Sequence, residues 1–538
     1  MKILKPRKEK LSIYLVKDSS STEVGKFIKI ENSKTPVDLD VRSYQATLYM
    51  KKEPLKKPPP WTRLFTENQN LPEDIFGSSR SVGAALVARL NGCVFVLTFG
   101  SGFHLLKNEA IERDFGLRVT LNSVDPDKLR SLDKASYDHN PLNSRTQSSI
   151  DLDIFELDLD SEMDMLYAVT GVSKVEEFGS HVTGRDALTL LISIDLEGLS
   201  KILSETIKRY KSNLPKVFEW IDNINRVKDN DELEVLDLEL DDVLADYEKH
   251  NIWLGEPEVV DWESQIGYSF DLYAKTPRHV VLTVKSLVDY LHGNGLLFDV
   301  GTLKSQAVHV NNNEYESTKK WTAYRCIYAE IIVGAENYIL RNGLWYRVNR
   351  DFVISVDNYL KRLDKYDYKF PIYNHDREED YNSHVVESDT NFELMDKKLV
   401  KIGGRYDKLE FCDLIRNGVD FVHVKYYRSS STLSHLFSQG LVASETFISD
   451  SGFRERLNKK LPISAKLVDV TVRPDPSKYR IVYAIATNKN IPNELPFFSK
   501  VTLKNSLKML KALNYNVSLV SLDVDKTLSV KKKAKPKK

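Results

Sequence analysis

The chain has 538 residues, and its 77 lysines and arginines balance its 77 aspartates and glutamates. With 41% hydrophobic and 29% charged residues, the composition is that of a globular protein and excludes a disordered or fibrous chain. The neutral total also argues against a chain coated for non-specific binding of nucleic acid. At about 150 residues per domain, the length predicts three to four domains.

No stretch approaches the roughly 18 apolar residues of a membrane span, and the first residues lack the apolar core of a secretion signal. We therefore expect a cytoplasmic protein with no membrane partner. The cysteines Cys93, Cys326 and Cys412 are too widely spaced for a disulfide framework or a zinc knuckle. We expect them to be reduced and mostly buried.

Changes of pattern along the chain predict an α+β multidomain protein. Its expected parts are an N-terminal α+β region (1–249), a middle α+β region with a hairpin (250–369), a C-terminal mixed α/β domain (370–530) and a disordered basic tail (531–538). We expect the functional site to lie in the C-terminal domain (370–530).

In the N-terminal region, apolar runs predict strands at 11–15 and 93–100. The second run ends in Gly100-Ser101-Gly102, which we interpret as a tight turn, because the longer glycine patterns of phosphate-binding loops are absent. A segment rich in lysine and proline at 51–61 predicts an extended linker. At 229–248, leucines recur at helical spacing among ten acidic residues, which predicts a helix with a solvated acidic face or a dock for a basic partner.

In the middle region, Asn342-Gly343 lies between alternating apolar runs, which predicts a β-hairpin at 338–348. Aromatic side chains near Arg341, Arg347 and Arg350 would form a platform for stacking nucleic-acid bases if they were exposed. Packing within a sheet is the commoner role of such side chains, so both interpretations are kept.

The best candidates for catalytic or metal-binding residues lie between Lys408 and Gln439. The pattern predicts a strand at 408–415, a turn at Arg416-Asn417-Gly418, a strand at 419–426 and a helix from Thr432 to about Phe447. Further along, it predicts strands at 481–486 and 517–522 and a helix at 503–513. Such alternation is typical of a mixed α/β layer.

This stretch resembles the core of restriction-type nucleases of the PD-(D/E)xK superfamily, in which neighbouring strands carry an Asp and a (D/E)-x-K and a following helix often carries Gln. The resemblance implies a nuclease that uses Mg²⁺ or Mn²⁺ to activate water and to neutralise the phosphoryl charge. Asp413 and Glu410 are then the expected metal ligands. Lys425 would stabilise the attacking hydroxide, and Gln439 would orient the phosphate or the water.

One position departs from that pattern. His423 stands where an acidic residue is expected, so the tripeptide is His423-Val424-Lys425. The metal site loses a carboxylate unless Glu379, Glu393 or Glu410 supplies it. In this hypothesis His423 replaces the carboxylate as a ligand or as a proton acceptor.

The turn between the two strands decides which side chains share a face, because faces alternate along a strand. If Asn417-Gly418 is a two-residue turn, Glu410 lies opposite Lys425 and Asp413 faces away. If Arg416-Asn417-Gly418 is a three-residue loop, Asp413 joins the face of Lys425. The sequence fits both registers.

Several blocks of residues carry a second resemblance, which spans nearly the whole chain. They are 99–102 with 115–117, Tyr346 with 349–353, 410–414 with 423–425, 431–437 and 495–500. Together they resemble one sporadically distributed bacterial family of about this length, catalogued as a domain of unknown function. The resemblance implies a patchy distribution, as mobile and defence-associated genes have, and it implies no catalytic residues.

Two functions are therefore kept as hypotheses. In the first, the chain is an anti-phage defence protein whose C-terminal domain cuts foreign DNA or RNA. In the second, His423 marks a lost active site, and the same face binds nucleic acid, a phage protein or the product of a neighbouring gene as a sensor or scaffold. Two carboxylates within metal reach of Lys425 would favour the enzyme, and a lone ion pair would favour the binder.

Overall fold

A computed structural model describes residues 8–52, 82–136, 143–152, 159–162, 164–250, 252–258, 260, 265–272, 278–312, 315–401, 408–427 and 430–531. The chain folds into two compact units, formed by Met1–Ala135 with Asn143–Ile221 and by Ser136–Leu142 with Asp222–Lys538. Each unit mixes helices with β-sheets, so the expected α+β multidomain class is confirmed. The finer division into three domains stays a prediction. Most of the proline-rich segment and nearly all of the basic tail lie outside the described residues.

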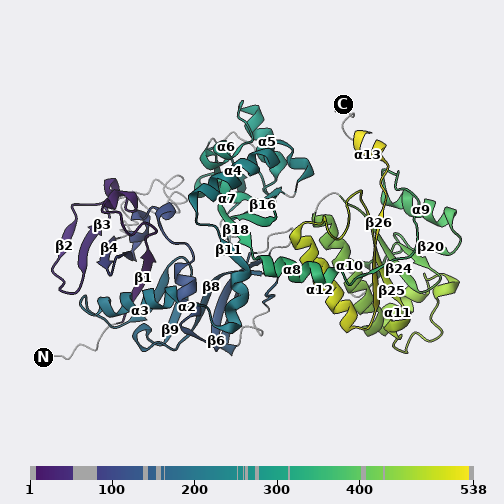
Figure 1. Cartoon of the computed structure of the whole chain (residues 1–538), viewed down its shortest axis with the longest axis horizontal. Coiled ribbons are helices and arrows are strands. Elements are labelled where there is room, and N and C mark those ends of the chain that lie inside the picture. The colour runs from purple at the N-terminus through teal and green to yellow at the C-terminus, as the bar shows by residue number, and fades with distance from the viewer. Residues whose placement is uncertain are drawn as a thin grey trace, which may run out of the picture. The chain divides into compact units, whose positions relative to one another are not determined.

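The first unit is built on a sheet of ten described strands (Figure 1). Their order is β2 (Val37–Leu39), β3 (Gln45–Met50), β4 (Gly83–Leu90), β5 (Cys93–Gly100), β1 (Glu9–Leu15), β10 (Leu188–Ile192), β9 (His181–Gly184), β8 (Asp164–Ser173), β6 (Val124–Ser136) and β7 (Asn143–Leu152). Helix α2 (Phe115–Leu121) packs on β8 and β9, and α3 (Leu199–Lys211) packs on α2. The strands predicted at 11–15 and 93–100 are confirmed as the neighbours β1 and β5.

The glycines after β5 serve close packing of the backbone. Gly100 has a φ of 55°, in the left-handed region that favours glycine. A Cβ on Gly102 would lie 1.9 Å from the carbonyl oxygen of Ala84 in β4. The turn continues into a short 3₁₀-helix at Ser101–Leu105, so packing against β4 accounts for these glycines.

The second unit begins with two small sheets and four helices. One sheet has the order β11 (Ile224–Arg226), β18 (Leu344–Val348), β17 (Glu336–Arg341), β16 (Ile327–Val333) and β12 (Ile252–Leu254), and the other has the order β13 (Gly267–Ser269), β14 (Ala307–Asn311) and β15 (Ser317–Thr322). The helices are α4 (Asn230–Ala245), α5 (Val284–Gly293), α6 (Val300–Ser305) and α7 (Ala323–Cys326).

Helix α4 confirms the amphipathic helix expected at 229–248, and it buries Leu236, Leu240 and Leu244. Several of its acidic side chains are exposed, as expected, whereas others bind neighbouring elements. The Asp237 carboxylate accepts hydrogen bonds from the Tyr324 hydroxyl at 2.6 Å and from the Trp345 indole at 2.9 Å. Glu232 accepts hydrogen bonds from the Tyr338 hydroxyl and from Arg347. These acids hold the helix on its own sheet.

The hairpin predicted at 338–348 is confirmed as β17 and β18. Asn342 and Gly343 have φ angles of 50° and 69°, and Arg341 pairs directly across them with the first residue of β18. Arg341 is buried, and Arg347 is bound to α4. Both arginines are engaged inside the unit, which favours the packing interpretation over a platform for bases.

The C-terminal part of the second unit contains a six-stranded sheet. Its order is β19 (Asp364–Lys365), β26 (Asn516–Leu522), β25 (Arg480–Ala486), β24 (Asp420–Tyr426), β23 (Leu414–Arg416) and β20 (Phe392–Leu394). Strands β24, β25 and β26 are parallel, and β23 is antiparallel to both of its neighbours. The surrounding helices are α8 (Arg350–Leu360), α9 (Glu378–Ser388), α10 (Ser430–Ser449), α11 (Ser451–Asn458), α12 (Phe497–Ala512) and α13 (Lys526–Lys531).

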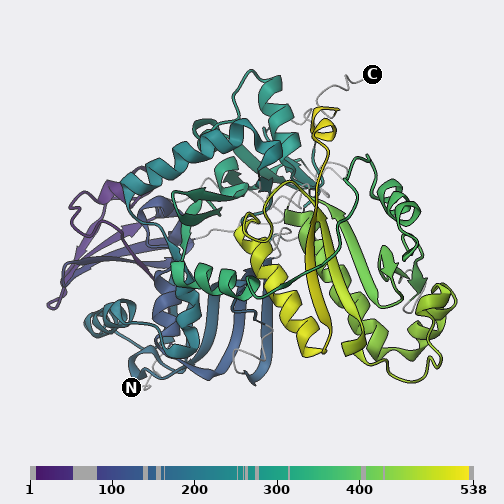
Figure 2. The same cartoon turned by 45° about the vertical axis from the view of Figure 1, so that its right-hand side comes forward.

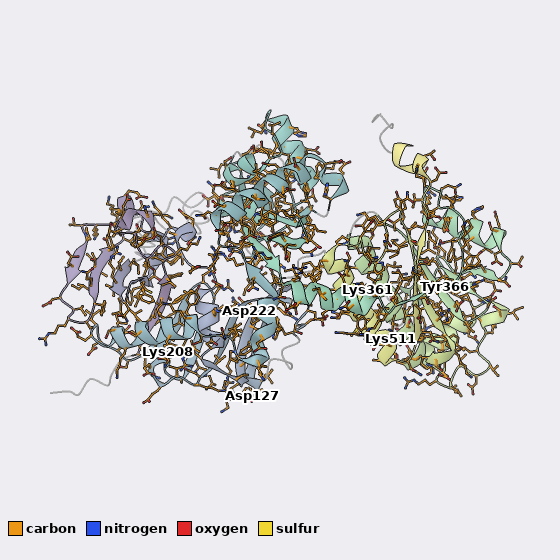
Figure 3. All side chains as sticks on the ribbon, in the orientation of Figure 1. Asp127, Lys208, Asp222, Lys361, Tyr366 and Lys511 are labelled. Atoms are coloured by element: carbon orange, nitrogen blue, oxygen red, sulfur yellow. The ribbon has the colours of Figure 1, made fainter. Side chains whose placement is uncertain are left out.

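Helices cover both faces of this sheet (Figures 1 and 2). Helix α9 lies on the face that carries Val422 and Val424. Helices α10 and α12 pack together on the opposite face, where the Phe437 ring lies 5.2 Å from the Tyr483 ring of β25. Helix α8 packs beside α12, with the Lys511 Nζ atom 5.6 Å from the centre of the Tyr359 ring. Figure 3 labels Lys511 on α12 and Lys361, which directly follows α8.

The single strand predicted at 408–415 is wrong. The chain forms two short strands there, β22 (Lys408–Leu409) and β23, and the residues between them are outside the sheets. Strand β22 pairs instead with β21 (Val400–Lys401). Lys408 and Leu409 therefore belong to a separate two-stranded sheet, which keeps them from extending β23. Glu410 and Asp413 therefore lie outside the strands, and the alternation of side chains along a strand does not determine where they point.

Candidate metal centre

The hairpin of β23 and β24 has neither of the predicted registers. Arg416 pairs with Asp420, so the loop between them has three residues, 417–419. Asp413 lies just before β23, where its N–H donates to the Val422 carbonyl oxygen at 3.0 Å and its carboxylate accepts from the Val424 N–H, so neither predicted assignment of faces applies to it.

Three carboxylates converge at the start of β23. Asp396 belongs to the turn that follows β20, and Glu410 and Asp413 lie between β22 and β23. One oxygen from each side chain lies within 4.8 Å of the others. The backbone joins the segments, because the Asp396 N–H donates to the Asp413 carbonyl oxygen at 2.9 Å. Such a group of oxygens suits one divalent cation of the Mg²⁺ or Mn²⁺ type.

Hydrogen bonds hold two of these carboxylates in place. Glu410 accepts from the Lys397 N–H at 2.5 Å and from the Gln439 side-chain amide at 3.2 Å. Asp413 accepts from the Val424 N–H at 2.7 Å, so its side chain takes a donor of the β24 backbone. The structure thus joins Gln439 of α10 to Glu410, and Asp413 to the backbone of β24.

The acids of the cluster disfavour one another's ionised forms. Burial raises the pKa of Asp413 well above its usual value, and the neighbouring Glu410 and Asp396 raise it further, although the hydrogen bond from Val424 opposes them. Burial likewise raises the pKa of Glu410, with Asp396 adding to the effect. A bound cation would favour the ionised forms, because its charge offsets both the burial and the repulsion.

Lys425 lies in an ion pair at the edge of this cluster. Its Nζ atom is 2.7 Å from one oxygen of Glu378, and the other oxygen of Glu378 accepts from the Tyr426 N–H at 3.2 Å. Glu378 is the first residue of α9, and it also raises the pKa of Asp413. Among the described residues, Glu378 is the carboxylate that Lys425 contacts, which is the feature expected of the binder.

His423 lies apart from the three clustered carboxylates. Its side chain is 1% exposed, and neither ring nitrogen has a hydrogen-bond partner among the described residues. Burial lowers its pKa to about 4, so the imidazole is neutral at pH 7. Its ring centre is 6.0 Å from that of Tyr483. Its role as a ligand or proton acceptor stays a prediction.

Sequence reasoning missed Asp396 and Glu378. Of the acids considered for the missing ligand, Glu410 joins the cluster, whereas Glu379 is bound to Lys397 and Glu393 to Ser464. The sign that could have pointed to Asp396 is its position in the turn after β20, directly before Lys397. That lysine has a φ of 61°, a backbone conformation that side chains rarely adopt and that often accompanies functional sites.

The family described as "Family of unknown function (DUF6119)" matches residues 11–523. The chain belongs to this family. The match covers nearly the whole DUF6119 chain, including every member of the carboxylate cluster, and confirms the expected membership of a family of unknown function. No curated protein and no solved structure matches the chain.

Two further expectations concern the whole DUF6119 chain. Among the described helices, none combines the length and apolar character needed to cross a bilayer. The three cysteines are free thiols, and Cys326 and Cys412 are buried, as expected. Burial raises the pKa of both of these thiols, which leaves them in the unreactive protonated form.

Proposed function

We propose that this DUF6119 protein is a nuclease that hydrolyses phosphodiester bonds with Mg²⁺ or Mn²⁺ bound at the carboxylate cluster. The observation that carries the proposal is the convergence of Asp396, Glu410 and Asp413 within 4.8 Å. Hard divalent cations prefer oxygen ligands, and a bound cation lowers the pKa of water and offsets charge on a phosphoryl group.

The order of elements around the cluster supports a restriction-type core. Asp413 precedes β23, Lys425 lies on the antiparallel neighbour β24, and Gln439 lies on the next helix along the chain, α10. This is the order of the PD-(D/E)xK plan. Asp396 offers the carboxylate that the plan expects at position 423, so the histidine there does not leave the cation short of acidic ligands.

Each residue has a role that its contacts support. Asp396, Glu410 and Asp413 would hold the cation. Lys425, which Glu378 holds at 2.7 Å, would stabilise the attacking hydroxide. Gln439 is hydrogen-bonded to Glu410 and would orient the phosphate or the water. His423 lies apart from these groups, and burial lowers its pKa to about 4, which makes it a weak proton acceptor at pH 7.

Two basic side chains that bind the segment after Asp396 favour a polyanionic substrate. The Lys460 Nζ atom donates to the Leu399 carbonyl oxygen at 2.7 Å, and the Arg456 Nε atom donates to the Lys401 carbonyl oxygen at 2.6 Å. These cations gather around the segment that directly succeeds Asp396. Their arrangement supports contacts with phosphates, which supply sequence-independent affinity for DNA or RNA.

A role in defence against phage is part of this proposal. It rests on the patchy distribution that the family resemblance implies. It is tested by comparing phage plaque counts on cells that express the wild-type chain and on cells that express the Asp413→Ala variant.

The second candidate is a sensor or scaffold that binds nucleic acid, a phage protein or a neighbouring-gene protein without cutting. Two observations favour it. His423 occupies the usual acidic position, and Lys425 lies in an ion pair with Glu378. Under this alternative the same basic side chains bind the partner, and the carboxylates have only a structural role.

The test is cleavage of labelled single- and double-stranded DNA and RNA by the full-length chain with Mg²⁺ or Mn²⁺. We expect metal-dependent cutting that falls about a hundredfold or more in Asp413→Ala and in Lys425→Ala, because each removes a group that acts on the reacting atoms. Glu232→Gln is the matched control, since it breaks an ion pair of the same unit far along the sequence. Salt-dependent binding without cutting would favour the second candidate, and neither binding nor cutting would overturn the nuclease and leave a protein partner to be sought.

A further inference from the structure

Asn382 is a buried polar residue of α9 that contacts the carboxylate cluster. Its side chain is 0% exposed. The Nδ2 atom donates to Oδ2 of Asp396 at 3.2 Å, whereas Oδ1 has no hydrogen-bond partner among the described residues. A buried carbonyl oxygen without a partner costs stability, so folding alone does not account for an asparagine at this position.

The orientation of the amide is fixed by chemistry. An ionised carboxylate only accepts hydrogen bonds, so the N–H side of Asn382 must face Asp396. Because Oδ1 and Nδ2 are bonded to the same carbon, the unpartnered oxygen also lies beside the cluster. It is a neutral oxygen ligand of the kind that Mg²⁺, Mn²⁺ and Ca²⁺ accept in proteins.

We infer that Asn382 is a member of the metal centre, where it orients Asp396 through Nδ2 and supplies Oδ1 as a further ligand to the cation. The inference rests on the proposed function for the existence of the metal centre. Cation binding then satisfies the one atom of this side chain that is unpaired among the described residues. The cluster becomes a site of three acidic oxygens and one amide oxygen.

Asn311 of β14 offers a matched control. It is also buried, but both ends of its side chain are hydrogen-bonded, with Nδ2 donating to the Ser269 hydroxyl at 2.9 Å. The same hydroxyl lies 3.2 Å from Oδ1 of Asn311. This asparagine is accounted for by its contacts in the fold, so it reports the effect of losing a buried, paired amide.

The experiment measures Mn²⁺ affinity by titration calorimetry and thermal unfolding in EDTA, on the full-length chain. We expect Asn382→Leu to weaken Mn²⁺ binding about ten- to a hundredfold, as loss of a ligand or of its support does. Its Tm in EDTA should be equal to or above that of the wild type, because leucine removes an unpaired buried oxygen. Asn311→Leu should lower the Tm in EDTA and leave the Mn²⁺ affinity within about twofold.

Asn382→Asp keeps an oxygen at the position and adds charge, so it should bind Mn²⁺ at pH 8 at least as tightly as the wild type. Unchanged Mn²⁺ affinity in Asn382→Leu, or Asn382→Asp binding as weakly as Asn382→Leu, would overturn this inference and leave the metal centre standing. A wild-type chain that does not bind Mn²⁺ would overturn the metal centre itself, and this inference with it.

Discussion

Two hairpins of the second unit share one turn sequence and differ in the register of the strands that it joins. Asn342-Gly343 joins β17 to β18, and Asn417-Gly418 joins β23 to β24. The φ angles are 50° and 69° in the first turn and 52° and 72° in the second, so the backbone makes the same turn twice. Beyond the first turn the strands pair at once, whereas the second hairpin inserts Val419 before pairing begins.

Contacts with other segments explain the difference. The Val419 carbonyl oxygen accepts from the Arg480 N–H at 3.0 Å, which ties the extra residue to the parallel strand β25. A Cβ on Gly418 would lie 2.3 Å from the Ser464 carbonyl oxygen, so backbone from another loop covers the turn. The comparison teaches that Asn-Gly determines the turn and that tertiary contacts determine the register.

Each of the two hairpins also has an ion pair with a neighbouring helix. In each, a basic residue of the second strand binds an acid in the first turn of a helix: Arg347 binds Glu232 of α4, and Lys425 binds Glu378 of α9. The first pair holds a helix on a sheet. In the second pair, the Glu378 carboxylate also raises the pKa of Asp413.

The largest expected effect is a difference in stability between glycine-to-alanine variants of the two turns. Gly418→Ala should destabilise the protein by about 3 kcal/mol or more, because alanine is strained at a φ of 72° and would also meet the Ser464 backbone. Gly343→Ala should cost only about 1 to 2 kcal/mol, since its closest neighbour is the flexible Arg325 side chain at 3.0 Å. Urea unfolding of both variants measures the difference, and equal costs would contradict the account of the second turn.

A smaller effect is expected from Asp413→Asn. Because burial raises the pKa of Asp413, the folded protein keeps this proton to higher pH than the unfolded chain does. The carboxyl therefore contributes stability at low pH that is lost as the pH rises above about 4, the usual pKa of Asp. In EDTA at pH 8 the variant should be about 1 to 3 kcal/mol more stable than the wild type.

Calorimetry of both proteins from pH 4 to pH 8 checks this sign. The buried His423, with its pKa lowered to about 4, loses stability as the pH falls below its usual value near 6.5. That loss occurs in both proteins and cancels in their difference. A gain at pH 4 as large as the gain at pH 8 would show that ionisation of Asp413 is not the cause.

The smallest effect on stability comes from the two ion pairs. Glu378→Gln and Glu232→Gln should each change the free energy of unfolding by less than about 1 kcal/mol, because both pairs are partly exposed. Only Glu378→Gln should slow nucleic-acid cleavage, by about tenfold in kcat with KM unchanged, since Lys425 loses its anchor. Equal cleavage rates in the two variants would mean that Glu378 does not position Lys425.

Much of the fold can be read from local pattern. The apolar runs at 93–100, 481–486 and 517–522 predict β5, β25 and β26, and the structure confirms them. The prediction fails at 408–415, where the pairing of β22 with β21 divides the expected strand. Local periodicity reports which residues are apolar, and it does not report which distant segment will pair with them.

The candidate site was likewise predicted only in part from the local sequence pattern. The sequence by itself determined that Lys425 lies on a strand and Gln439 on the helix that follows it, whereas it placed Glu410 and Asp413 on a strand that the structure does not form. Only the tertiary structure decided that Asp396, Glu378 and Asn382 join them and that His423 lies outside the carboxylate cluster. The physical reason is that side-chain alternation fixes a face within one element, whereas the meeting of carboxylates from separate segments depends on how those elements pack.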